Sequence, residues 1–484
     1  MVDHAISNRI ENLLSAEETS ALMRVMDAYP MPSVSLGIGR DAQQLYDGMN
    51  HADNVPSELY ELYDVKRGLR NSDGSGVLVG LTTVASVHGY NKVAGKVIPD
   101  EGRLILRGYE IDDLVAGAHS EGRFGYEEVA YLLIAGSLPT QAQLADFCAR
   151  IGARRQLPEG YLTIFPRTTY SPSIMNVLQR ATLLLYAFDP TPDDTRPIHE
   201  VDVALSLLGR WPRVASVAHA AYAASQEDRK LKIPPAREEY SVAESVLDVL
   251  RGDEGFTRDE ALLLDIMLML HAEHGGGNNS TFTTRVLSSS GTDAYSAYSA
   301  ALGSLKGPKH GGANFKAGEM IDDIADHVTR WDSDDEVADY LSKILRREAF
   351  DKTGLIYGLG HAVYTVTDPR AEIVKRYATT LASEKGQLEK LELIERVERL
   401  GPEVMRDVRG IKKPISTNID LYTGFVYQML GIPQDLYTPI FAIARMAGWA
   451  AHRMEELYGS ARIIRPAYNA VMEHHNYEPI SERK

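Results

Sequence analysis

The chain contains almost no cysteine: Cys148 is the only one among 484 residues. A single cysteine excludes an intramolecular disulfide and a metal centre built on several thiolates, and this usage is typical of a reducing compartment. An isolated thiol packs in a core more often than it acts as a nucleophile. We therefore expect Cys148 to be chemically inert.

The chain also lacks an excess of positive charge and any long apolar run. It has 51 Lys and Arg against 67 Asp and Glu, a formal net charge of -16, which disfavours non-specific binding to nucleic acid or to an anionic membrane. The longest apolar stretch, residues 261–270, is far shorter than the roughly 20 residues that span a bilayer. The N-terminus shows no signal-peptide or transit-peptide pattern. We therefore expect a cytoplasmic protein with no nucleic-acid and no membrane partner, in which residues 261–270 form a buried helix.

Apolar residues spaced three and four apart dominate the sequence. After Asp334 they form one stripe with charges on the opposite face, the pattern of an amphipathic helix. The stripe consists of Val337, Tyr340, Leu341, Ile344 and Leu345. Similar stripes recur along most of the chain, and 44% apolar residues is ample for a core. The pattern predicts an all-α protein.

Strand-like alternation is confined to one region near the N-terminus. It occurs at residues 77–87 and 102–107, on either side of a stretch that contains Gly89, Gly95 and Pro99. The sequence therefore predicts one small β hairpin in an otherwise helical fold.

A further helix is expected to end just before Gly459, with Thr438 as its N-cap and Pro439 at its first position. Residues 439–451 contain one charge, Arg445, among apolar residues on all sides, which indicates a buried helix. A guanidinium cannot lose its charge, so Arg445 needs an acceptor in the interior. Either a protein carboxylate or a bound anion would serve.

Three short segments flanked by glycine carry side chains suited to chemistry. They present His310 in Lys-His-Gly-Gly-Ala-Asn, His361 in Gly-Leu-Gly-His-Ala-Val, and Asp420 in Asn-Ile-Asp-Leu. Glycine lets backbone and ligand approach closely and adopts turn conformations that other residues resist, which favours presentation of these side chains to a ligand over packing in a core. Two imidazoles and one carboxylate suit proton transfer at carbon.

Two more arginines are candidates for anion binding. Arg370 closes Thr-Asp-Pro-Arg nine residues after His361, within reach of the same ligand if the segment forms a turn and the start of a helix. Planar guanidiniums bind carboxylates through paired hydrogen bonds, so several arginines in one pocket imply a substrate with several carboxylates. Arg465, which follows Arg462, is by itself better explained by a surface charge pair.

His271 and His274 follow the expected helix at residues 261–270. Their spacing allows a metal pair, but no third ligand of a zinc-type signature accompanies them, so we expect no metal. His274 stands where the helix meets three glycines, which directs its ring beyond the helix end. We interpret His271 as a structural histidine.

Taken together, these motifs resemble the citrate synthase family. In family order, the matching segments are His274-Gly-Gly-Gly-Asn, Ser304-Leu-Lys-Gly-Pro-Lys-His310, Gly358-Leu-Gly-His361, Thr367-Asp-Pro-Arg370, Asn418-Ile-Asp420 and Pro439-Ile-Phe-Ala-Ile-Ala-Arg445. Each motif is weak alone, and together they are highly specific over about residues 78–465.

The resemblance implies a two-domain helical enzyme. Residues 76–312 and 431–484 would form a large domain, and residues 313–430 a small domain that closes over the active site. Residues 1–75 would be an N-terminal arm of unclear role within the large domain. The family also implies a homodimer, or a multiple of dimers, in which Arg465 reaches the active site of the other chain.

The family's catalytic roles, carried over by motif, fall on three residues. Asp420 would remove a methyl proton from acetyl-CoA, and neutral His310 would hydrogen-bond the thioester oxygen. His361 would polarise and then protonate the ketone oxygen of oxaloacetate. Water would then hydrolyse the citryl-CoA thioester, which makes the condensation effectively irreversible.

Substrate binding is carried over in the same way. The oxaloacetate carboxylates would be held by His274, Arg370, Arg445 and Arg465. Contacts to CoA would come from Gly358, Gly360 and Lys413, with no metal and no cofactor beyond the CoA thioester itself. Thr365-Val366 stands where many relatives carry basic residues near the CoA phosphates, so Lys412 and Lys413 would have to replace them, unless they are only a solvated pair.

The sequence leaves two alternatives to citrate synthase. A 2-methylcitrate synthase uses propionyl-CoA with the same residues, and a hydrophobic pocket discriminates one methylene by only about 1–3 kcal/mol. A catalytically inactive helical scaffold would be expected to have lost at least one of His310, His361 and Asp420, and all three are present.

Overall fold

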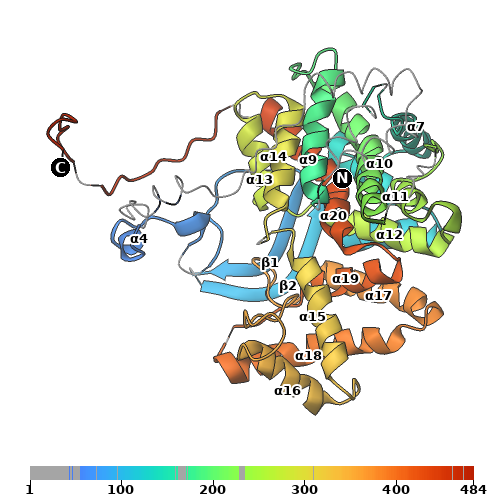
Figure 1. Cartoon of the computed structure of the whole chain (residues 1–484). Coiled ribbons are helices and arrows are strands. Elements are labelled where there is room, and N and C mark those ends of the chain that lie inside the picture. The colour runs from blue at the N-terminus through green and yellow to red at the C-terminus, as the bar shows by residue number, and fades with distance from the viewer. Residues whose placement is uncertain are drawn as a thin grey trace.

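A computed structural model describes most of the chain (Figure 1). The described residues are 43, 46, 55–71, 74–94, 96–158, 160–161, 171, 173–227, 235–308, 310–411, 413–459, 462–472 and 474–483. Most of the expected N-terminal arm, residues 1–75, as well as Gly95 and Lys412, lie outside them. The protein is mostly helical with one small sheet, which confirms the all-α prediction with its N-terminal hairpin.

The helices and strands have the following bounds. The α-helices are α4 (Glu58–Leu62), α5 (Ile111–Ser120), α6 (Tyr126–Ala135), α7 (Gln141–Ala153), α9 (Ile174–Leu185), α10 (Pro197–Glu227), α11 (Val242–Arg251), α12 (Arg258–His271), α13 (Asn279–Ser288), α14 (Ala294–Leu305), α15 (Ala313–His327), α16 (Asp334–Leu345), α17 (Pro369–Glu384), α18 (Leu388–Arg409), α19 (Asp420–Met429) and α20 (Tyr437–Tyr458). Short 3-10 turns are η1 (Arg67–Leu69), η2 (Tyr186–Phe188), η3 (Gly252–Glu254) and η4 (Gln434–Leu436). The strands are β1 (Ala85–Val93), β2 (Lys96–Leu106) and β3 (Tyr109–Glu110).

The hairpin exists, but its predicted bounds were wrong. Antiparallel pairing runs from Ala85 with Leu106 to Val93 with Lys96, so the turn is short and Gly89 and Pro99 lie within strands. The pairing shifts register between His88 and Tyr90, on either side of Gly89. Such an irregularity is where a strand tolerates glycine, which explains why the region looked turn-rich.

Glycines in the hairpin allow it to pack closely on a loop far away in the sequence. A Cβ atom on Gly89 would lie 2.6 Å from the Cα atom of Tyr364, and one on Gly102 would overlap the carbonyl oxygen of Thr367. The hydroxyl of Thr365 donates to the carbonyl of Gly89. The hairpin therefore supports the loop between His361 and Arg370.

Helix α20 lies at the centre of the larger group of helices, with contacts to α6, α10, α12, α13 and α14 (Figure 1). Trp449 on α20 and Trp211 on α10 are both buried, with ring centroids 6.0 Å apart. The expected buried helix at residues 261–270 is confirmed as part of α12. The predicted N-cap was wrong: α20 begins at Tyr437, directly after the 3-10 turn η4, so Thr438 lies inside it and donates its hydroxyl proton to the carbonyl of Gly311.

Helices α15 to α19 form a second group below the first in Figure 1. They contact one another through the pairs α15–α19, α16–α18 and α17–α19, and they contact the first group through α5, α12 and α20. The apolar stripe expected after Asp334 is buried along α16, which confirms that helix. The division into two domains at residues 313 and 430 stays a prediction.

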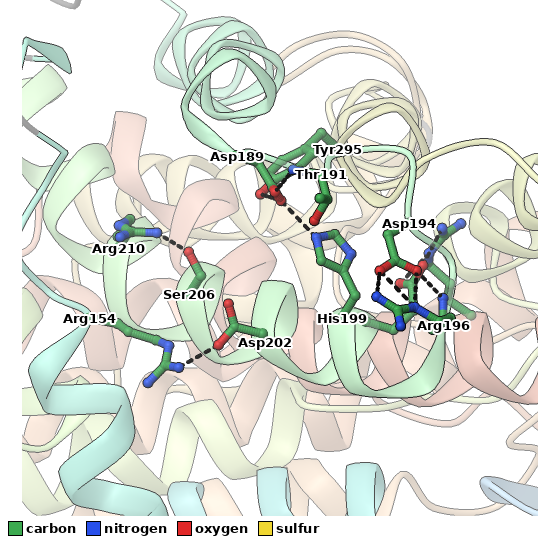
Figure 2. Close-up of polar contacts among 12 residues, drawn as sticks. Arg154, Asp189, Thr191, Asp194, Arg196, His199, Asp202, Ser206, Arg210 and Tyr295 are labelled. Atoms are coloured by element: carbon green, nitrogen blue, oxygen red, sulfur yellow. Dashed lines mark hydrogen bonds and ion pairs between the residues drawn. The ribbon is translucent and has the colours of Figure 1, made fainter.

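A polar cluster fixes the connection between α9 and α10 (Figure 2). The carboxylate of Asp189 accepts a hydrogen bond from the Tyr295 hydroxyl at 2.8 Å and lies 2.9 Å from Nε2 of His199. Next to it, Asp194 accepts paired hydrogen bonds from Arg196, from Nε at Oδ1 and from Nη2 at Oδ2. The cluster ties the start of α10 to α14.

After α20, residues 462–472 and 474–483 run outward as an extended segment (Figure 1). The large apolar side chains of Tyr468, Met472, Tyr477 and Ile480 are exposed on it. Among the described residues, no helix combines the length and the apolarity needed to cross a membrane.

Candidate active site

Two glycines shape the loop that carries His361. Gly358 and Gly360 both have positive φ, at 82° and 89°, a conformation that glycine adopts without strain. A Cβ atom on Gly358 would also lie 2.7 Å from the Cβ atom of Leu421. The loop can therefore approach the start of α19, which carries Asp420, only because residue 358 is glycine.

Backbone pairing fixes this loop against the segment before Asp420. The amide of Gly360 donates to the carbonyl of Ser416 at 2.7 Å, and the amide of Asn418 donates to the carbonyl of Gly358 at 2.9 Å. The Asn418 side chain then donates to the carbonyl of Gly360 and accepts from the amide of Asp420. Two of the three motifs predicted to act together, those of His361 and Asp420, are thus joined directly.

The tautomer of His361 follows from its hydrogen bonds. Its Nδ1 atom accepts from the amides of Val363 and Tyr364 at 3.0 and 2.9 Å. An imidazole that accepts at Nδ1 carries its proton on Nε2. Burial, with a smaller contribution from the charge of Arg370, lowers the pKa of His361 to about 4. His361 is therefore a neutral hydrogen-bond donor at Nε2.

His274 lies beside His361, beyond the end of α12. The two rings meet edge to face with centroids 5.2 Å apart, and Nε2 of His274 lies 3.2 Å from the Tyr364 hydroxyl. Burial holds the pKa of His274 well below its usual value, and Arg370 contributes to the shift. The His274 ring thus points beyond the end of α12, as the sequence predicted.

Arg370 is the second residue of α17, as expected for a turn that leads into a helix. Asp368 caps that helix and accepts from the Arg370 amide, from its Nε atom at 3.0 Å and from its Nη2 atom at 2.7 Å. The same carboxylate accepts from the amide of Ile419 at 3.2 Å. Asp368 therefore holds the Arg370 guanidinium next to the start of α19.

Asp420 is the first residue of α19 and is partly buried. Burial raises the pKa of this carboxyl to about 6, with an opposing effect of Arg370 and a smaller raising effect of Asp368. A carboxylate with a raised pKa is a stronger base than one in water, and it is still ionised near neutral pH.

His310 precedes α15. Its Nε2 atom lies 3.1 Å from the Ser280 hydroxyl, which also donates to Oδ1 of Asn278 at 3.0 Å. Burial lowers the pKa of His310 to about 4, and the charge of Arg445 contributes. The ring is thus neutral, and the start of α13 holds its orientation.

Arg445 is fully buried on α20, with 0% of its surface exposed. Its Nε atom donates to the carbonyl of His271 at 2.7 Å. Neither Nη1 nor Nη2 has a hydrogen-bond partner among the described residues. Burial lowers the pKa of this guanidinium to about 10, while the charge of Glu273 acts in the opposite direction. Of the two acceptors that the sequence left open, the geometry favours a bound anion.

Phe441 connects the two halves of the site. Its ring centroid lies 4.8 Å from that of His271 and 6.3 Å from that of His310, and the guanidinium carbon of Arg445 lies 4.6 Å from the ring centroid. The ring nitrogens of His271 are buried without a hydrogen-bond partner among the described residues. His271 therefore faces the same interior region as Arg445.

Two other predicted site residues lie outside this cluster in the single chain. Arg465 is exposed on the C-terminal segment, and Lys413 is exposed before α19. Lys412 lies outside the described residues. Thr365, which stands where a basic residue was expected, donates to the hairpin. Their expected roles stay predictions.

Several residues of the site were missed by the sequence analysis. Tyr364 stacks on His361 with centroids 4.5 Å apart, Asp368 holds Arg370, and Ser280 contacts His310. Asp368 had a local signal, since Asp before Pro is a common helix start. Tyr364 and Ser280 had none, because their partners lie far away in the sequence.

In the described part of the chain, no three or more His, Cys, Asp or Glu side chains are arranged to hold a metal ion, and the expectation of no metal stays a prediction. Burial raises the pKa of the Cys148 thiol to about 12, so this thiol stays protonated at neutral pH, as an inert cysteine would.

The sequence is similar to known proteins of one family. Residues 74–467 match the family model described as "Citrate synthase, C-terminal domain". Citrate synthase from Haloferax volcanii is 33% identical over 424 residues, which cover 87% of this chain and 99% of that protein. 2-Methylcitrate synthase 1 from Corynebacterium glutamicum is 35% identical over 394 residues, covering 80% and 94%.

Solved structures resemble the fold as well. Citrate synthase from Thermoplasma acidophilum, in a ternary complex with carboxymethyl coenzyme A and oxaloacetate, superposes with a TM-score of 0.67 at 26% identity. The match covers 84% of this chain and 98% of that chain.

Proposed function

The chain belongs to the citrate synthase family, and we propose that it condenses acetyl-CoA with oxaloacetate and water to give citrate and CoA. This acyl transfer stands at the entry to the tricarboxylic acid cycle. The observation that carries the proposal is Arg445, a fully buried guanidinium whose two terminal nitrogens have no partner among the described residues. A carboxylate of oxaloacetate supplies the missing acceptor.

Carbon–carbon bond formation needs a base for the methyl group of acetyl-CoA. Asp420, with its pKa raised to about 6, accepts that proton. His310 donates a hydrogen bond to the thioester oxygen, where negative charge develops as the enol or enolate forms. Because the pKa of His310 is about 4, its ring is neutral near pH 7. A neutral imidazole keeps one ring proton, which it can donate in this hydrogen bond.

The enol carbon then attacks the ketone carbon of oxaloacetate. His361 donates its Nε2 proton to the ketone oxygen as the new bond forms. The two backbone amides that donate to Nδ1 hold His361 in the tautomer that carries this proton. His274, Arg370 and Arg445 hold the carboxylates. Water hydrolyses the citryl-CoA thioester and releases the CoA thiol, and the reaction uses no cofactor beyond the CoA thioester.

Water exclusion makes a carboxylate adequate as a base for a carbon acid. We propose that residues 313–430, which include α15 to α19, move as a small domain and close over the cleft. His361, Arg370 and Asp420 belong to that segment, whereas His274, His310 and Arg445 belong to the rest of the chain. Contacts of Gly358, Gly360 and Lys413 with CoA are part of the same proposal.

A homodimer would complete the site with Arg465 of a second chain. The C-terminal segment supports this, because Tyr468, Met472, Tyr477 and Ile480 are exposed on it and large exposed apolar side chains favour a partner surface. The single cysteine and the net charge of -16 fit a cytoplasmic location.

The substrate test is release of CoA thiol in the presence of oxaloacetate, with acetyl-CoA and propionyl-CoA at matched concentrations and with a chelator. A preference for acetyl-CoA is the expected result. Equal or better use of propionyl-CoA would identify a 2-methylcitrate synthase, which the relative from Corynebacterium glutamicum makes a close alternative. No thiol release from folded protein would contradict both.

A further inference from the structure

Glu273, next to the proposed oxaloacetate ligand His274, is a fully buried carboxylate with no place in the mechanism above. Its Oε1 atom accepts from the amide of Gly275 at 2.6 Å. This bond spans His274, so it fixes the turn on which the His274 ring stands. Gly275 has a φ of 86°, and a side chain there would strain the same turn.

The second partner of Glu273 is His452 on α20. Nη2 of Arg285 donates to Nδ1 of His452 at 2.7 Å, which leaves the His452 proton on Nε2. That proton is donated to Oε1 of Glu273 at 2.8 Å. Arg285 in turn is held by Glu455 and by Glu456. A relay of buried hydrogen bonds therefore runs from the end of α20 to the turn of His274.

Close packing joins this relay to α20. A Cβ atom on Gly448 would overlap Oε2 of Glu273, and one on Gly276 would lie 3.2 Å from Nε of Arg285. Helix α20 also carries Arg445, one turn before Gly448. The relay thus sets the position of α20 relative to the turn of His274, and with it the spacing of two proposed oxaloacetate ligands.

Glu273 and Arg445 attract one another without pairing. Each lowers the cost of burying the other, since the charge of Arg445 favours the ionised carboxylate and Glu273 favours the ionised guanidinium. Yet Oε2 of Glu273 and both Nη atoms of Arg445 lack hydrogen-bond partners among the described residues. The carboxylate supplies a counter-charge at a distance, and the guanidinium keeps its donors for an incoming anion.

We propose that Glu273, held by His452 and Arg285, is a positioning residue that sets the geometry of His274 and Arg445 for oxaloacetate. The inference rests on the proposed function, because it concerns the same dicarboxylate site. Glu273 itself need not touch the substrate. It acts through the turn after α12 and through α20.

The test measures oxaloacetate binding by calorimetry, together with the KM values for oxaloacetate and acetyl-CoA, in the full-length protein. Glu273→Ala removes both acceptor bonds and is expected to weaken oxaloacetate binding about tenfold or more, as displaced ligands do. The KM for acetyl-CoA should change less than about twofold, because the relay contacts only the oxaloacetate ligands. Glu273→Gln keeps an oxygen for both donors and should remain within about threefold of the unmodified protein.

The matched control is Glu200→Gln. Glu200 is a buried carboxylate that also binds α20, through paired 2.7 Å bonds with Arg453, but it does not contact the turn of His274. Its replacement should lower the unfolding temperature and leave oxaloacetate affinity unchanged. Arg285→Gln provides a second variant if Glu273→Ala does not fold, and it should weaken oxaloacetate binding several-fold.

The inference is overturned if Glu273→Ala or Arg285→Gln binds oxaloacetate as the unmodified protein does. It is also overturned if Glu200→Gln weakens binding as much as Glu273→Ala, since the effect would then be general destabilisation. If the unmodified protein neither binds oxaloacetate nor releases CoA thiol, the proposed function fails instead. The unmodified protein thus tests the proposed function, and the variants test the positioning role of Glu273.

Discussion

Replacing Arg445 by Leu separates the two explanations for a buried guanidinium. If the partner of Arg445 is the substrate, Arg445→Leu removes a buried charge with two unpartnered nitrogens from the empty protein, and it removes a ligand of the oxaloacetate carboxylate from the loaded protein. We therefore expect a protein that is more stable without oxaloacetate and binds oxaloacetate far more weakly.

The magnitude follows from the pKa of Arg445. Burial lowers it from 12.5 to about 10, and a shift of this size corresponds to about 3 kcal/mol at pH 7, at ~1.4 kcal/mol per unit. The guanidinium is charged in both states at that pH, so the lowered pKa destabilises the folded protein. This figure already includes the attraction to Glu273, and loss of the bond to the His271 carbonyl offsets part of the gain. We expect a net gain of about 1–2 kcal/mol in the free energy of unfolding.

Binding should change in the opposite direction. Truncating one partner of a buried, hydrogen-bonded charge pair costs about 2–5 kcal/mol, which weakens oxaloacetate binding by about 30-fold to several thousand-fold. In the unmodified protein, oxaloacetate at 100 times its Kd should stabilise the fold by about 2.7 kcal/mol. At the same concentration, oxaloacetate should stabilise Arg445→Leu by less than about 1 kcal/mol in thermal or denaturant unfolding.

Arg453→Leu is the matched control on the same helix. Arg453 is also fully buried, but its Nε and Nη2 atoms donate to the two carboxylate oxygens of Glu200, and its Nη1 atom donates to the Ser288 hydroxyl. Its removal strands a buried carboxylate and should destabilise the fold by about 3–5 kcal/mol, with oxaloacetate affinity unchanged. The reasoning is refuted if Arg445→Leu binds oxaloacetate normally, or if it destabilises the empty protein as strongly as Arg453→Leu does.

Three further predictions concern the base, its titration and the hairpin. Asp420→Asn should abolish condensation while oxaloacetate affinity in calorimetry stays nearly unchanged, and strong residual thiol release would contradict the role of base. The pH profile of kcat/KM for acetyl-CoA should fall about tenfold per unit below pH 6, because Asp420 with a pKa of about 6 becomes protonated there while His310 and His361, with pKa values of about 4, stay neutral. A profile that stays flat down to pH 5 would refute this assignment. Gly102→Ala should lower the unfolding temperature and raise the KM for oxaloacetate, because its Cβ overlaps the Thr367 carbonyl; unchanged values of both would show that the hairpin does not support the loop.

Periodicity predicted the helical architecture well, because apolar spacing within one helix is a local property. The stripe of α16 and the apolar character of α12 and α20 sufficed to identify these helices as buried. Boundaries were less well predicted. Thr438 had the composition of an N-cap, yet the preceding turn η4 continues into α20 and moves the helix start to Tyr437.

The hairpin shows why local signals can mislead. Gly89 looked like a turn residue, but it lies in a strand, and both Gly89 and Gly102 pack against another segment of the chain. Gly89 makes room for Tyr364, and Gly102 for Thr367. Their need for glycine comes from contacts across more than 260 residues of sequence, which no local pattern reveals.

The sequence by itself determined which chemical groups this protein has for its site: His310, His361 and Asp420 in glycine-rich turns, and Arg445 without a nearby countercharge in the chain. Only the tertiary structure decided their state. Two backbone amides select the tautomer of His361, burial raises the pKa of Asp420, and the turn held by Glu273 places His274. Proton affinity and hydrogen-bond direction depend on the groups and the water around an atom, and folding brings those groups together from distant parts of the chain.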